Sequence, residues 1–243
     1  MPVAMNDHRD PGQVALPGEG GEVVLRVKRN PRARRISLRA DPRDGAVVLV
    51  LPMHASLDAG LAFARSQAAW IRARLAAAPR PLPFAPGTRL GVQGEELEIV
   101  HDAARRGPAR REGALLVVGG KPEFVARRVR DFLRAEAGRR LGALAAAKAA
   151  TLGRTLRALR ISDTRSRWGS CARDARISLS WRLVIAPPCV ADYVVAHEVA
   201  HLAHHDHSPA FWRVVDTLTG HRAEAQAWLR ANGAALLGAG RPG

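Results

Sequence analysis

Apolar and polar positions alternate along the first part of the chain in a pattern that is typical of strands. The three segments richest in β-branched residues predict an antiparallel meander: residues 23–29, 34–40 and 46–52. Asp44 and Gly45 supply a turn between the last two of these strands. Ser56 is then a suitable N-cap, and apolar residues at near-helical spacing predict a helix from there to about residue 78.

The pattern changes after this helix, which ends at a cluster of prolines. Two short strands follow it: residues 95–101 and 114–118. An apolar stripe at helical spacing after Pro122 predicts a long helix that ends near Ala150. Two more strands and then two helices complete the pattern, the strands at residues 156–161 and 176–185.

The first of the two final helices carries the clearest chemical motif. It begins at Pro187-Pro188, where proline in the first turn removes no helical hydrogen bond. His197 and His201 are four residues apart, which places the two imidazoles about 40° apart on one face, within reach of a single zinc ion. Glu198 lies beside them, where it can hold a water without binding the metal. A bare motif of this kind also fits a helix with two ordinary histidines.

Two features favour the metal site over ordinary histidines. Apolar residues surround the pair on the same helix, and a packed helix does not normally turn two histidines inward without partners. The strand expected at Ile177–Val184 is of the kind that zinc peptidases place beside the metal as an edge to which an extended substrate adds. Both features predict a zinc-dependent hydrolase.

A catalytic zinc usually has three protein ligands, and His207 is the first candidate for the third. It follows His201 by six residues and precedes Ser208-Pro209, which predict the start of a new helix. The turn between the helices can return His207 to the ion. His204, His205 and a carboxylate such as Glu224 remain alternatives.

The segment before the strand at 176–185 carries two candidate substrate-binding residues. Arg165 and Arg167 can meet an anionic substrate group or a developing oxyanion. They can equally pair with carboxylates such as Asp163 or Asp174. Trp168 and Cys171, in the same segment, are expected in the core.

The composition adds a strong excess of basic residues. The formal net charge is +16, and only three of the 38 basic residues are lysine. A field of this sign attracts polyanions, so nucleic acid or a nucleotide is a candidate partner. An arginine-rich bias on solvated surfaces explains the excess equally well, because no aromatic residues alternate with the basic ones in a stacking pattern.

The apolar content predicts a cytoplasmic protein with no membrane partner. No segment approaches the roughly 18 consecutive apolar residues that span a bilayer. The first residues include acids and lack the apolar core of a signal peptide. Cys171 and Cys189 are too few and too far apart in sequence for a disulfide framework.

Four ordered segments together resemble the YgjP-like zinc metallopeptidases, which are related to the SprT-like and WLM zincin proteases. The segments are TRSRWGSC at 164–171, ISLSWRLVIAPP at 177–188, HEVAH at 197–201 and HSPAFW at 207–212. The resemblance extends over about residues 23–235. It implies His197, His201 and His207 as zinc ligands and Glu198 as the catalytic base, and it favours His207 over Glu224.

The expected fold class is α+β, with a small β-rich N-terminal lobe before a zincin-like catalytic domain that has an active-site helix and an adjacent antiparallel sheet. The expected boundaries give a loose tail, a β-rich lobe with one helix, a metallopeptidase domain and a C-terminal tail: residues 1–21, 22–120, 121–237 and 238–243.

The expected activity is metal-assisted hydrolysis of a peptide or protein substrate. Zinc acidifies a water and polarises the scissile carbonyl, while Glu198 takes the proton and passes it to the leaving amine. Two other functions remain open. The arginine excess suits a metal-dependent nucleotide phosphohydrolase, and it also suits a nucleic-acid-binding module in which zinc is structural.

Overall fold

The chain folds as an α+β protein, as expected, with six α-helices and three small sheets in the part that the computed structural model describes. The described residues are 12–17, 22–41, 46–76, 82–164 and 167–240. They form two compact units, one within residues 1–80 and one within residues 81–243. Within these ranges, each helix is too short or too polar to cross a bilayer.

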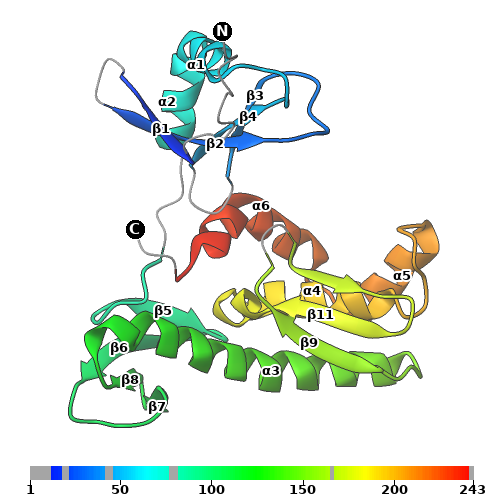
Figure 1. Ribbon diagram of the computed structural model, residues 1–243. Coiled ribbons are helices and arrows are strands. Elements are labelled where there is room, and N and C mark those ends of the chain that lie inside the picture. Colours follow the sequence, from blue (N-terminus) through cyan, green and yellow to red (C-terminus); the bar gives the residue numbers. More distant parts are fainter. Residues whose placement is uncertain (1–11, 18–21, 42–45, 77–81, 165–166, 241–243) are drawn as a thin grey trace, which may run out of the picture. The chain divides into compact units, whose positions relative to one another are not determined.

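The first unit consists of a four-stranded sheet and two helices, shown in blue and cyan in Figure 1. The sheet has the order β1-β2-β4-β3. Its strands are β1 (Gln13–Leu16), β2 (Val23–Arg29), β3 (Ser37–Ala40) and β4 (Val47–Leu51). The helices are α1 (Leu57–Ser66), which Ser56 caps, and α2 (Ala68–Ala76), so the single expected helix is interrupted at Gln67.

Two expectations for this unit are wrong. Strand β2 pairs with β4 in parallel, so the three expected strands are not an antiparallel meander. The chain passes over one strand position between β2 and β3, and β4 then returns between them, where Leu49 and Leu51 are fully buried. The expected loose tail also contains strand β1, which pairs with β2 in antiparallel register. The expected Asp44-Gly45 turn lies outside the described residues.

The second unit begins with a sheet of order β5-β6-β8-β7. Its strands are β5 (Arg89–Val92), β6 (Glu95–Asp102), β7 (Arg110–Glu112) and β8 (Leu115–Gly119). The turn after β5 is hydrogen-bonded to the later part of this unit, because the backbone N–H of Gln93 donates to the Val184 carbonyl over 2.9 Å. The Gly240 amide likewise donates to the Leu82 carbonyl over 2.9 Å. The units therefore divide at residue 80, whereas the expected lobe extended to residue 120.

A short 3₁₀ helix, η1 (Pro122–Phe124), leads into the long helix α3 (Val125–Thr151), drawn in green in Figure 1. Buried residues recur every four positions along α3, at Val125, Val129, Leu133 and Ala137, and the series continues to Ala149. One stripe of α3 thus packs against the sheet β5–β8 near its start and against the rest of the second unit along its length.

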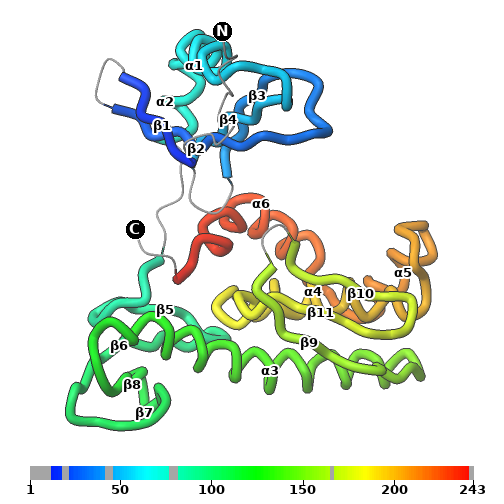
Figure 2. Tube along the Cα trace, in the orientation of Figure 1, coloured from blue at the N-terminus to red at the C-terminus, as the bar shows by residue number. Residues whose placement is uncertain are grey.

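A second, smaller sheet follows α3, and its order is β10-β11-β9 (Figure 2). The strands are β9 (Ala158–Ser162), β10 (Gly169–Cys171) and β11 (Arg176–Ser180). Because β9 pairs with β11 in parallel and β10 pairs with it in antiparallel register, the sheet is mixed rather than antiparallel as expected. The expected edge strand at Ile177–Val184 is also wrong, since β11 is the central strand and β10 lies at the edge.

The strand β11 ends early because the Ser180 side chain accepts a hydrogen bond from the Arg182 amide and starts the 3₁₀ helix η2 (Trp181–Ile185). Three helices complete the unit: α4 (Pro188–Ala200), α5 (Pro209–Leu218) and α6 (Arg222–Gly238). Helix α4 contacts α3, α5, α6, β10 and β11, and nine of its 13 residues are buried. It is therefore the central element of the unit.

A buried lysine connects the helices around α4. Lys148 on α3 is 8% exposed. Its ammonium group lies 2.6 Å from an Asp192 carboxylate oxygen on α4 and donates to the Leu218 carbonyl at the end of α5, also over 2.6 Å. One charged group thus joins three helices, and removing it leaves a carboxylate and a carbonyl without their partner.

We expect Lys148→Met to lower the free energy of unfolding by about 2 to 3 kcal/mol. The Met side chain fills the space of the lysine methylene groups, but both polar contacts of the ammonium group are lost. Chemical denaturation of the purified protein measures this change. The matched control is Lys121→Met at an exposed lysine, which should change stability by no more than about 0.5 kcal/mol. Equal effects of the two substitutions would contradict the role assigned to Lys148.

Candidate metal centre and adjacent cavity

Helix α4 places the two histidines of the HEVAH motif where the sequence spacing predicts them. The helix starts at Pro188 and ends at Ala200, and His201 keeps right-handed helical backbone angles as its C-cap. The ring centroids of His197 and His201 are 5.1 Å apart. The chain turns at residues 201–203, so His204 and His205 lie after the end of α4.

The turn after α4 brings His207 back to this pair. Ser208 caps α5, and its hydroxyl accepts a hydrogen bond from the Phe211 amide. His207, just before this cap, has its Nε2 atom 3.2 Å from Nε2 of His197. One ligand atom from each of His197, His201 and His207 lies within 4.8 Å of the others. The structure therefore brings together the three expected ligands.

The three imidazoles suit a single metal ion. Zinc–nitrogen bonds of about 2.0–2.1 Å in tetrahedral geometry separate two ligand nitrogens by about 3.3 Å, close to the observed separation of His197 and His207. The Nδ1 atom of His201 lies 2.9 Å from the His204 carbonyl, so Nδ1 carries the proton and the lone pair of Nε2 is available. The donor set and its spacing fit zinc.

Electrostatics keep two of these histidines in the neutral form that binds metal. Burial, together with the neighbouring His201 and His207, lowers the pKa of His197 to about 4. The pKa of His201 is also lowered, mainly by burial. At neutral pH both rings are therefore uncharged, with no proton to displace from the ligand atom.

Aromatic side chains of α5 pack against the histidine cluster. The Phe211 ring is fully buried and stacks on His201, with 4.5 Å between the ring centroids. It meets His197 edge to face at 5.0 Å, and Trp212 lies 5.7 Å from His197. These contacts restrict the rotation of the imidazoles, so the ligand atoms are held in place by packing as well as by the backbone.

Glu198 lies on the side of α4 that faces strand β10 and is 6% exposed. Burial raises the pKa of its carboxyl group to about 7, and the positive charge of Arg167 acts in the opposite direction. A Cβ atom on Gly169 would lie only 2.5 Å from Cγ and 2.6 Å from Oε1 of Glu198. The absence of a side chain at Gly169 thus leaves the space that the Glu198 carboxyl group occupies.

The alternative third ligands lie elsewhere. Glu224 is exposed near the start of α6, with its carboxylate 3.5 Å from Nδ1 of His221. Burial, and after it the charge of Glu224, raise the pKa of the Cys189 thiol, which lies at the opposite end of α4 from His201. His205 is exposed, and His204 contributes its backbone carbonyl to His201.

The two candidate substrate-binding arginines are placed differently. Arg165 lies outside the described residues, whereas Arg167 is exposed and lines a cavity beside His197 and Glu198. Trp168 is partly buried against the core, as expected. Cys171 is half-buried near Glu198. Its pKa is raised to about 11, mainly by burial and also by the charges of Glu198 and Asp174. A protonated thiol of this kind is a poor metal ligand.

Sequence reasoning missed the contribution of α6 to this cavity of about 480 Å³. Gln226, Leu229 and Arg230 line it from one side of that helix. Their spacing of three and four residues predicts a shared helix face, but nothing in the sequence indicates that this face meets α4. Gly169 was also missed, because its importance depends on a contact with Glu198 on a different element.

An α+β unit whose central helix contributes two of three clustered histidines, with a buried carboxyl group beside them, belongs to the class of metal-binding domains. The chain matches the family model described as the YgjP-like metallopeptidase domain over residues 34–232, so it belongs to the YgjP-like family. This family implies a metal ion and a peptide or protein substrate. Searches of curated proteins and of solved structures found no match.

We expect Gly169→Ala to destabilise the protein by about 1 to 3 kcal/mol, because the new methyl group overlaps the Glu198 side chain. In a Glu198→Ala background the overlap disappears, so the same substitution should cost at least about 1 kcal/mol less. Thermal or chemical unfolding of the four proteins in this cycle measures the coupling. Gly91→Ala, where a Cβ meets no atom within 4 Å, is the control. Additive effects would show that the two residues do not share this space.

Proposed function

We propose that the protein is a zinc-dependent peptidase. The observation that carries the proposal is the meeting of three imidazoles from two segments within 4.8 Å, next to a buried carboxyl group on the same helix as two of them. Membership of the YgjP-like metallopeptidase family supports the reaction class. The donor spacing supports zinc as the metal.

His197, His201 and His207 would hold the ion. Zinc with three imidazole ligands supplies a Lewis acid that acidifies water and polarises a carbonyl group. Glu198 is the general base: it takes a proton from water and delivers it to the leaving amine. Its position one residue after His197 holds the carboxyl group beside the ligands, and Gly169 leaves room for it.

The peptide backbone has a natural binding position at strand β10. This strand lies at the edge of its sheet, contacts α4, and begins at Gly169, beside Glu198. An extended peptide can pair with such an edge through main-chain hydrogen bonds, which recognise any sequence in extended form. The scissile bond would then lie along the face of α4 that carries Glu198.

We expect one zinc ion per chain, with His197→Ala and His201→Ala both losing it. His207→Ala should weaken zinc binding by more than about 100-fold, because loss of an outer partner of a ligand alone costs 10- to 100-fold. Zinc titration against a competing chelator measures these constants. Glu224→Ala and His205→Ala are controls that should bind zinc as the wild type does. A severe loss in Glu224→Ala with little change in His207→Ala would reassign the third ligand.

We expect Glu198→Gln to bind zinc and fold normally while kcat falls by at least about 100-fold, because an amide has the same shape but cannot accept a proton near neutral pH. Hydrolysis of an unfolded protein such as casein provides the assay, and zinc content provides the control for an intact site. Turnover at the wild-type rate would show that Glu198 is not the base.

The two alternative functions predict different results in the same experiments. A nucleotide phosphohydrolase would release phosphate from nucleoside triphosphates and leave casein intact. A nucleic-acid-binding module with structural zinc would bind DNA with a steep dependence on salt and hydrolyse neither substrate. Casein hydrolysis that requires both zinc and Glu198 supports the peptidase alone.

A further inference from the structure

The cavity beside the candidate metal centre is large enough for a bulky side chain. Its volume of about 480 Å³ falls within the usual range for ligand-binding pockets, and both His197 and Glu198 line it. Whatever occupies the cavity therefore lies next to the group that we propose as the general base. In a peptidase, the occupant is a residue that adjoins the scissile bond.

The body of the cavity is mostly apolar. Trp168, Val194 and Leu229 contribute to its wall, from the segment before β10, from α4 and from α6. The Tyr193 hydroxyl, which also lines the cavity, already accepts a hydrogen bond from the Gln226 side-chain amide over 2.8 Å. This lining favours the apolar part of a large side chain.

Two guanidinium groups line the same cavity from different elements. Arg167 precedes β10 and Arg230 lies on α6, and both are exposed. Within the described part of the chain, neither has an ion-pair partner, whereas nearby Arg176 lies 2.8 Å from Asp174. Glu198 is the one carboxyl group among the described lining residues, and it is buried. The cavity thus has two guanidinium groups that form no ion pair with a side chain of the described residues.

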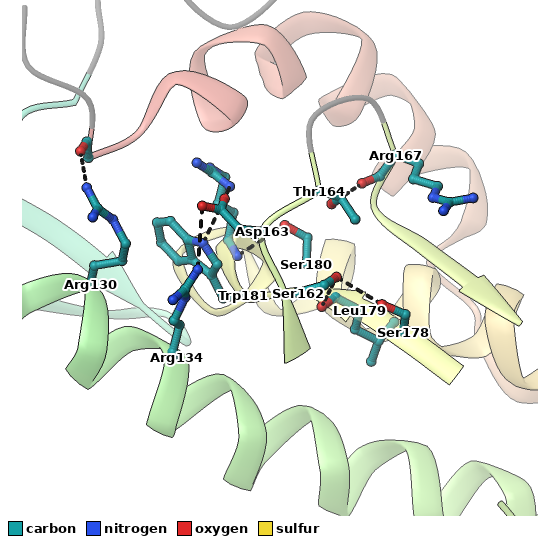
Figure 3. A network of polar contacts seen from close by, with 12 residues as sticks. Arg130, Arg134, Ser162, Asp163, Thr164, Arg167, Ser178, Leu179, Ser180 and Trp181 are labelled. Carbon is teal, nitrogen blue, oxygen red and sulfur yellow. Dashed lines mark hydrogen bonds and ion pairs between the residues drawn. The ribbon is translucent and has the colours of Figure 1, made fainter. Parts of the chain in front are cut away.

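Hydrogen bonds hold the backbone on both sides of Arg167, and Figure 3 shows those formed by Asp163 and Thr164. The Thr164 hydroxyl donates to the Arg167 carbonyl over 2.6 Å. Before this segment, Asp163 accepts hydrogen bonds from the Trp181 indole, over 3.2 Å, and from the buried Arg182. After it, the Ser180 amide donates to the Trp168 carbonyl over 2.8 Å. These contacts fix the position from which the Arg167 side chain reaches the cavity, which reduces the ordering cost of binding.

We propose that the cavity selects substrates that carry a carboxylate together with a bulky apolar group next to the scissile bond. The apolar group fills the cavity, and Arg167 and Arg230 pair with the carboxylate, for which planar guanidinium groups are well suited. The carboxylate comes either from an acidic side chain or from the C-terminus of the substrate. This inference rests on the proposed peptidase function, because it names the substrate class of that site.

The first test measures binding to the metal-free protein, so that no ion can attract the carboxylate. The probes are 3-phenylpropionate and its neutral analogue 3-phenylpropanamide, titrated by calorimetry. We expect the carboxylate to bind about tenfold more tightly than the amide, since ion pairs with two exposed guanidinium groups each contribute only modestly to binding. The double variant Arg167→Met/Arg230→Met should lose this preference.

The matched control is Arg173→Met, which removes one charge from an exposed arginine in the turn after β10, outside the cavity. It should keep the preference of the wild type. A wild-type protein with no preference, or a preference that survives in the double variant, would overturn the proposal. Because this test needs neither zinc nor turnover, a positive result with a protein that cleaves no peptide would contradict the peptidase function alone.

The second test identifies the source of the carboxylate with the zinc-loaded protein. Three peptides of one sequence are compared: one with an internal Glu after an aromatic residue, one with Gln in its place, and one that ends in a free carboxylate there. A higher kcat/KM for the internal Glu assigns an acidic side chain, and a higher value for the free end assigns a C-terminal residue. Equal cleavage of all three would contradict the selection. The double variant should raise KM for the favoured peptide by a larger factor than it raises KM for the Gln peptide, so that the ratio of the two kcat/KM values falls towards one.

Discussion

The site depends on the burial of helix α4. Its apolar residues occur on every side, so α3, α5, α6 and strand β10 each cover part of its surface. His197 and Glu198 therefore leave bulk water when the helix packs, and this burial accounts for the low pKa of the imidazole and the raised pKa of the carboxyl group. A solvated helix with the same sequence motif would give neither effect.

The parts of the fold that the sequence predicts are those determined over a short stretch of chain. The proline start of α4, the four-residue spacing of its histidines and the Ser208 cap of α5 all act within a few residues, and the structure has each of them. The parallel pairing of β2 with β4 and of β9 with β11 joins strands that are separated by other elements. Strand partners depend on distant contacts, which local periodicity does not encode.

The same distinction applies to the site. The three expected ligands, His197, His201 and His207, come from one segment of eleven residues, so their spacing in the sequence is enough to suggest a metal site. Gly169, Gln226 and Arg230 reach the cavity from other elements, and their own neighbours in sequence give no sign of it. Arginines illustrate the limit: Arg182 is buried against Asp163, whereas Arg167 is exposed without an ion-pair partner among the described residues. The sequence does not distinguish these two arginines, because their different environments arise from the packing of η2 and β9.

Burial of these groups has a cost that the surrounding core must offset. Glu198 is a carboxyl group held among apolar residues, and the Nδ1 atom of His197 is buried without a hydrogen-bond partner in the described residues. A core selected for stability alone would place apolar side chains at both positions. The polar residues persist where Phe211 and the apolar side of α4 supply enough packing to hold them. The destabilising burial of polar groups is concentrated around one cluster of histidines. This arrangement is expected where the polar groups serve chemistry rather than folding.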